Sequence, residues 1–226
     1  MFMEPTFRWY GPEDPVPLKF IPQTGATGIV TSLHYIPYGV VWTQDAILER
    51  RKMIEEAGMT WSVVESLPVH EEIKTGGKSR KRLIELYKLS IRNLGKVGPK
   101  IITYNFMPVL DWVRTDLHHR LPDGSTTLFF DQVKFAIFEL FILCRKGAEK
   151  DYTADVIAKA EEKYRQMTEH ERFVLRRSII DNFPGFKGVT LDDIRDMLAK
   201  YEGFTRERLS ENLHFFLNEV APVAEA

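Results

Sequence analysis

The sequence contains very little cysteine, no long hydrophobic run and almost no net charge. Its 226 residues include a single cysteine, Cys144, which excludes an internal disulfide and is typical of a reducing compartment such as the cytoplasm. No apolar run approaches the ~20 residues that a membrane helix needs. The 31 basic and 32 acidic side chains give a formal net charge of -1, which provides no bulk attraction to nucleic acid. We therefore expect a cytoplasmic globular protein that binds neither nucleic acid nor a membrane.

Phosphate-binding motifs are also missing. Neither GxGxxG nor GxxxxGK[ST] follows any expected strand, which argues against a dinucleotide-binding or P-loop domain. The first half of the chain instead repeats a short strand, an amphipathic helix and a glycine. We expect the strands near residues 7–10, 28–33, 61–66 and 101–106. This alternation predicts parallel strands, neighbours in chain order, in a doubly wound sheet or in part of a (β/α)8 barrel.

Two helices of this half have clear boundaries in the sequence. The first follows Thr43, a suitable N-cap, and ends before Gly58. Its expected apolar stripe consists of Ile47, Met53, Ile54 and Ala57. The second runs over about residues 78–98 and also ends on a glycine.

The alternation of strands and helices stops after the fourth expected strand. A Pro-Asp-Gly turn within "HHRLPDGSTTLFFD" predicts a hairpin, and helical patterns follow, one of them capped by Thr190 with Asp193 three residues later. A last helix begins near Thr205. We divide the chain into 1–114 (four βα units), 115–200 (an insertion of hairpin and helices on the fourth βα loop) and 201–226 (a barrel helix).

Polar residues gather where the expected strands end. They are His34, Glu65, His70, Asn105 and Asp111. Side chains contributed by the ends of several strands are typical of the active face of a barrel.

Three segments resemble the mannonate dehydratase family: "FRWYG", "VVESLPVHEEIK" and above all "YNFMPVLDWVRTDLHHRLPDGST". The similarity covers essentially the whole chain. It implies a (β/α)8 TIM barrel of the xylose isomerase-like type. It also implies dehydration of D-mannonate to 2-keto-3-deoxygluconate in hexuronate catabolism, with Mn2+ or Fe2+, by a homodimer or larger homo-oligomer.

The same resemblance implies that the metal ligands lie outside this chain. The family binds its metal through a His, a Cys, a second His and an Asp from the second half of the barrel, and the first follows a helix that resembles "LNEVAPVAEA", with which this sequence ends. We therefore expect the first four βα units plus the insertion, with no metal ligand and no catalytic residue before Ala226, and we expect the 226-residue chain alone to be inactive.

Four residues of the first half are candidates for substrate binding. Arg8 can hold a carboxylate through its planar guanidinium, or form an ion pair with a neighbouring strand. Glu65 can balance Arg8 or accept a hydrogen bond from a substrate hydroxyl. His70 can bind a sugar hydroxyl or be a solvated loop residue. Asn105 can both donate to and accept from hydroxyls.

Asp111, Trp112 and Arg114 complete the expected site, since a polyhydroxy acid needs cationic, amide and acidic partners and an aromatic wall. The alternative is a salt-bridge cluster at the strand end with Trp112 in the core. Two further residues have structural interpretations: Cys144 as a small buried residue, and His214 as a core or interface residue.

Two other functions remain open from the residues alone. A sugar isomerase or epimerase of the same barrel superfamily has less need of Arg8 or Arg114, because a neutral aldose has no carboxylate. A partial barrel that serves only as an interaction module would expose its aromatic runs, such as "FAIFELFIL".

Overall fold

The computed structural model describes residues 3–110, 112–181 and 188–226. The chain forms two compact units. Unit 1 runs to Pro108 and resumes over Gly203–Ala226, and unit 2 is Val109–Glu202. No helix among the described residues is both long and apolar enough to cross a membrane.

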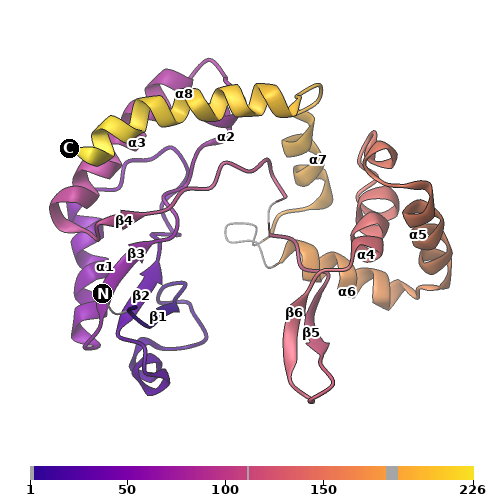
Figure 1. The fold of residues 1–226 in the computed structure, drawn as a ribbon, viewed down its shortest axis with the longest axis horizontal. Coiled ribbons are helices and arrows are strands. Elements are labelled where there is room, and N and C mark those ends of the chain that lie inside the picture. Colours follow the sequence, from indigo (N-terminus) through magenta and orange to yellow (C-terminus); the bar gives the residue numbers. More distant parts are fainter. Residues whose placement is uncertain (1–2, 111, 182–187) are drawn as a thin grey trace. The chain divides into compact units, whose positions relative to one another are not determined.

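Unit 1 is built on a parallel sheet (Figure 1). Its strands are β1 (Thr6–Arg8), β2 (Gly28–Thr31), β3 (Thr60–Val64) and β4 (Ile101–Ile102), side by side in that order. The predicted parallel pairing in chain order is confirmed. The strands end earlier than predicted, although single hydrogen bonds continue past them, from Trp9 N to Val30 O and from Glu65 N to Thr31 O, both 3.0 Å.

Helix α1 (Gln44–Glu56) begins as predicted. The Thr43 side chain accepts a hydrogen bond from Ala46 N, and Gly58 follows the helix with φ +75°. The predicted apolar stripe is wrong at Met53, which is 36% exposed. Arg50 is buried there instead, because position i+3 from Ile47 lies on the buried face and position i+6 lies beside it.

Two long helices pack against each other in unit 1: α3 (Arg80–Val97) and α8 (Arg206–Glu225) (Figure 1). Lys88 Nζ of α3 lies 2.5 Å from Glu219 Oε2 of α8. Phe216 of α8 is fully buried and contacts the rings of Tyr87, Tyr104 and Phe106. The short helices of this unit are η1 (Leu18–Thr24) and α2 (Glu71–Lys74).

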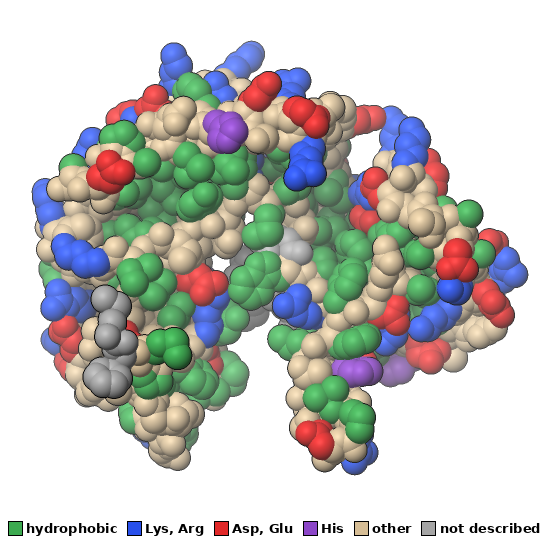
Figure 2. Space-filling model, viewed as in Figure 1, with side chains coloured by type: hydrophobic (Ala, Val, Ile, Leu, Met, Phe, Trp, Pro, Cys, Tyr) green, Lys and Arg blue, Asp and Glu red, His purple; other side chains and the backbone are tan. Residues whose placement is uncertain are grey.

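Unit 2 begins with the predicted hairpin, β5 (Asp116–Arg120) paired antiparallel with β6 (Thr126–Phe129). Its helical segments are α4 (Gln132–Ile137), the π-helical η2 (Phe138–Ile142), η3 (Ala148–Asp151), α5 (Ala154–Gln166), α6 (Glu169–Ile180) and α7 (Leu191–Ala199). Thr190 and Asp193 form the predicted capping box. Figure 2 shows hydrophobic and histidine side chains exposed on the hairpin.

The core of unit 2 includes Phe138 and the buried carboxylate of Glu139. Arg145 donates to both oxygens of this carboxylate, at 2.6 and 3.0 Å, and Tyr152 Oη donates to it at 2.5 Å. A buried carboxylate requires such partners. The network therefore ties η2 to the turn before η3.

Two side chains predicted to be buried are exposed. The burial prediction for Cys144 is wrong, because helical geometry ends at Ile142 and the backbone at Cys144 turns to φ +52°. His214 lies on the exposed side of α8, so its interpretation as a core residue is wrong.

We expect Phe216→Ala to lower the free energy of unfolding of unit 1 by about 3–5 kcal/mol, because it removes a fully buried ring between α8 and the core. Urea titration followed by tryptophan fluorescence measures this. The control is Phe20→Ala, the same substitution at a side chain that is 49% exposed. Equal losses of unfolding free energy in the two variants would contradict the placement of Phe216 in the core.

Candidate active site

The C-terminal ends of the parallel strands bring charged and aromatic side chains together. Arg8, the last residue of β1, lies 2.5 Å from Glu65, the first residue after β3. The two side chains remain 26% and 25% exposed. The guanidinium of Arg8 also lies 4.9 Å from the ring centre of Tyr10. The sheet thus joins two of the predicted site residues in one accessible ion pair.

His34 belongs to the same group of residues. Its ring lies 5.8 Å from that of Tyr10. Burial of the ring lowers the pKa of His34 from 6.5 to about 4, and the positive charges of Arg8 and Arg50 add to this effect. The residue as a whole is nevertheless exposed to solvent. Water therefore screens part of the repulsion between the imidazolium and the two guanidiniums. At neutral pH the imidazole is therefore uncharged, with one ring nitrogen that donates a hydrogen bond and one that accepts.

Asn105 is held close to Glu65 through Ser66. Its Nδ2 atom donates to Ser66 Oγ at 3.0 Å, and Ser32 Oγ donates to Ser66 O at 2.7 Å. The ends of β2 and β3 and the segment after β4 are therefore connected by side-chain hydrogen bonds. Within the described ranges no donor is found for the Asn105 amide oxygen, so it can accept a hydrogen bond from a ligand.

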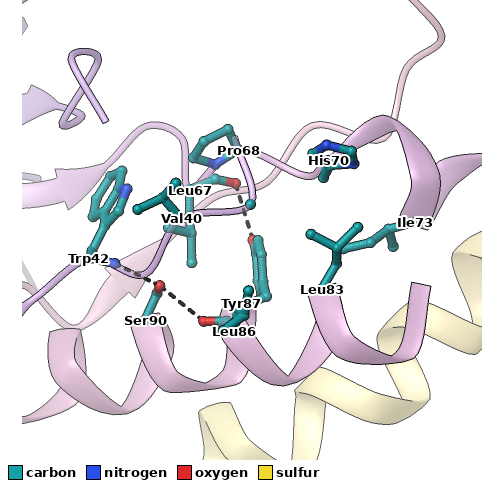
Figure 3. A pocket seen from close by; sticks show the side chains of 11 residues that line it. Val40, Trp42, Leu67, Pro68, His70, Ile73, Leu83, Leu86, Tyr87 and Ser90 are labelled. Carbon is teal, nitrogen blue, oxygen red and sulfur yellow. Dashed lines mark hydrogen bonds between the residues drawn. The ribbon is translucent and has the colours of Figure 1, made fainter. Parts of the chain in front are cut away.

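His70 has a structural role in α2. Its Nδ1 atom accepts a hydrogen bond from Glu72 N at 3.1 Å and so caps the helix. Its ring also lines a cavity of about 10 Å³ with Trp42, Leu67, Tyr87 and Ser90 (Figure 3). That volume suits about one water molecule and excludes a sugar acid.

The other predicted site residues belong to unit 2 or are not described. Asp111 lies outside the described residues. Trp112 is 53% exposed, so the alternative that places it in a core is wrong. Arg114 Nη1 donates to the backbone oxygens of Trp112 and Val113, at 3.2 and 3.0 Å. These bonds hold the guanidinium against its own chain segment.

The sequence interpretation missed Arg50. This residue of α1 is 4% exposed, and its Nη1 atom donates to Ser32 O at 3.0 Å, at the end of β2. The signal was present, because an arginine between Ile47 and Ile54 at helical spacing places a charge on an apolar face.

No group of three or more His, Cys, Asp and Glu side chains suited to a metal ion is found within residues 3–110, 112–181 and 188–226. The residues of the group around Arg8 do not fit a divalent metal either, since they combine two guanidiniums with one carboxylate.

The family model described as D-mannonate dehydratase (UxuA) matches residues 3–226. The chain belongs to this family. Mannonate dehydratases of Chromohalobacter salexigens and a Marinomonas species are 49% and 47% identical to it over 224 residues. A crystal structure of mannonate dehydratase from Streptococcus suis serotype 2 matches with a TM-score of 0.65 at 36% identity.

The chain spans little more than half the length of these relatives. Each alignment with the two curated mannonate dehydratases covers 99% of this chain and 57% of the relative. The Streptococcus suis match covers 100% of this chain and 51% of that one. The group of residues around Arg8 is therefore part of the region shared with D-mannonate dehydratases.

We expect the pKa of His34 in the native protein to lie below 6, and in the urea-unfolded chain near 6.5. Between the two values the unfolded chain binds a proton that the native state does not, so stability falls as the pH is lowered from 6.5 towards 4. Titration of the imidazole by NMR measures both values. A native pKa of 6.5 or above would contradict the packing described for His34.

Proposed function

We propose that the protein is a hydro-lyase that removes water from D-mannonate to give 2-keto-3-deoxygluconate. Membership of the D-mannonate dehydratase family supports this reaction. The observation that supports it most directly is the accessible Arg8–Glu65 pair at the C-terminal edge of a parallel sheet. This is the edge where barrel enzymes bind their substrates. The single cysteine supports a cytoplasmic location.

In this proposal Arg8 binds the carboxylate of the sugar acid. Its guanidinium is already oriented by Glu65 and by the ring of Tyr10. A planar guanidinium binds a carboxylate through two parallel hydrogen bonds. Glu65 then accepts from a substrate hydroxyl, and Asn105 binds another hydroxyl through its free carbonyl. These contacts select an acid over a neutral sugar.

The reaction removes a proton from the carbon next to the carboxylate and expels the hydroxyl group of the neighbouring carbon. Proton and hydroxide leave as water, and the enol that remains tautomerises to the keto acid. A bound Mn2+ or Fe2+ would stabilise the negative charge that develops beside the carboxylate. The described residues do not form a ligand set for such an ion. We therefore assign to this chain the binding and orientation of the substrate, and we infer that the metal ligands lie outside the described residues.

We further propose that the sheet is part of a (β/α)8 barrel. The four parallel strands follow one another in chain order, as in such a barrel. β4 is an edge strand of this sheet, and Ile101 on it is 56% exposed. Beside it, a groove of about 890 Å³ is lined by Ile91, Ile102 and Val223, from α3, β4 and α8. Hydrophobic side chains are also exposed beside α8 (Figure 2). A further βα unit would cover these surfaces.

We expect Arg8→Gln, introduced into the protein at the length of its relatives, to lower kcat/KM for D-mannonate about 100-fold, because a charged hydrogen-bonding partner of the carboxylate is lost. The assay follows formation of the keto acid. Arg82→Gln, at an exposed position of α3, is the matched control. If Arg8→Gln lowers only the melting temperature, the pair with Glu65 is structural and the carboxylate role is wrong.

The same assay separates the sugar isomerase alternative. Turnover of a neutral aldose by the wild-type protein, with no turnover of D-mannonate, would favour an isomerase or epimerase. No turnover of either, in a folded and metal-loaded protein, would favour an interaction module.

We expect the 226-residue chain alone to bind no catalytic Mn2+ tightly, since the described residues present no cluster of ligands. Calorimetric titration of Mn2+ into chain of verified mass measures this. Stoichiometric binding accompanied by dehydration of D-mannonate would contradict the assignment of the ligands to other residues.

A further inference from the structure

Arg50 is a charged residue in the core of unit 1. It is 4% exposed, and within the described part of the chain it forms no ion pair with a carboxylate. Burial accordingly lowers the pKa of its guanidinium. Burying a cation without a carboxylate partner costs free energy. Packing of α1 alone does not require this cost, because an aliphatic side chain between Ile47 and Ile54 would fill the same face.

The hydrogen bonds of Arg50 reach the end of β2. Its Nη1 atom lies 3.0 Å from Ser32 O and 3.4 Å from Thr31 Oγ1. Its guanidinium carbon also lies 5.2 Å from the ring centre of Trp9, just after β1. One side chain of α1 therefore contacts the ends of two neighbouring strands.

The loop after β1 folds against the same guanidinium. A β-carbon at Gly11 would lie 3.2 Å from Nη1 and 3.3 Å from Nη2 of Arg50, and Gly11 has φ +102°. Any other residue at this position would be strained by the positive φ and would press on the guanidinium. The ring centre of Tyr35, in the loop after β2, lies 5.9 Å from the guanidinium carbon.

These contacts flank two residues of the candidate active site. Arg8 directly precedes Trp9, and His34 directly precedes Tyr35. We propose that Arg50 is a positioning residue that joins the loop after β1 to the end of β2 and so fixes the side chains of Arg8 and His34 relative to each other. Arg50 touches neither substrate nor reacting atoms in this role.

The electrostatics of His34 agree with this role. Burial is the largest cause of its lowered pKa, followed by the charges of Arg8 and Arg50. The ring of Tyr10 faces it as well. Arg50 therefore orients the loops and also helps to keep the imidazole uncharged at neutral pH.

The first test does not depend on any catalytic activity. In Arg50→Met, NMR titration is expected to show a higher pKa of His34 than in the wild type, because one of the two positive charges that lower it is lost and the loops around its ring are no longer held together. Arg50→Lys keeps the charge and is expected to keep most of the lowered pKa. The matched control is Arg51→Met on the same helix, where the guanidinium forms an exposed pair with Glu55. An unchanged His34 pKa in folded Arg50→Met overturns the proposal.

The second test rests on the proposed function and uses the protein at the length of its relatives. Arg50→Lys is expected to lower kcat/KM for D-mannonate about tenfold, because an ammonium group cannot hold the Ser32 carbonyl and stack on Trp9 together. Arg51→Met is expected to behave as wild type.

Wild-type kinetics in Arg50→Lys together with an unfolded Arg50→Met would show that Arg50 serves stability alone, and would overturn the proposal. If the wild-type protein does not turn over D-mannonate, the proposed function fails while the His34 titration still decides the role of Arg50.

Discussion

The parallel alignment of β1 to β4 is the constraint on which the arrangement of the site depends. The register pairs Thr6 with Gly28, Gly28 with Thr60, and Val63 with Ile101. Strands so aligned all end at the same edge. The residues that follow them must therefore share that edge, however far apart they are in the sequence. This is why a residue at position 8 forms an ion pair with a residue at position 65.

Charge at this edge is unevenly compensated. Arg8 has a carboxylate partner in Glu65, whereas Arg50 donates to neutral oxygens and faces aromatic rings. His34 stays uncharged beside both guanidiniums. Among the described side chains at this edge, two guanidiniums thus face one carboxylate, and we propose that this excess of positive charge favours an anionic ligand such as a sugar acid. This positive charge would help Arg8 to bind a carboxylate, as proposed. Arg50 contributes to it in addition to its proposed positioning role.

The sequence was sufficient for the sheet because strand order and helix ends depend on local patterns. Four predicted helix boundaries are correct, those at Thr43, Gly58, Gly98 and Thr190. Helix caps can be predicted from sequence because they depend on residues next to one another in the chain. The site was harder to predict, because it depends on contacts between distant residues. Arg8 and Glu65 could be named but their pairing was one of two alternatives, and the cap formed by His70 depends on a side-chain orientation that sequence spacing does not determine. The burial prediction for Cys144 was wrong because a π-helical turn ends the regular helical spacing before this residue.

Unit 2 is the long segment that follows β4 in the chain. In the chain it lies between β4 and α8, and so occupies the position of a βα loop. Loops at that end of a parallel sheet can lengthen without disturbing the strands, because they are outside the ladder of hydrogen bonds. This insertion has its own core and its own buried ion pair between Glu139 and Arg145, so its fold is supported from within. An insertion with its own core can therefore occupy this connection without any change in the sheet that holds Arg8 and Glu65.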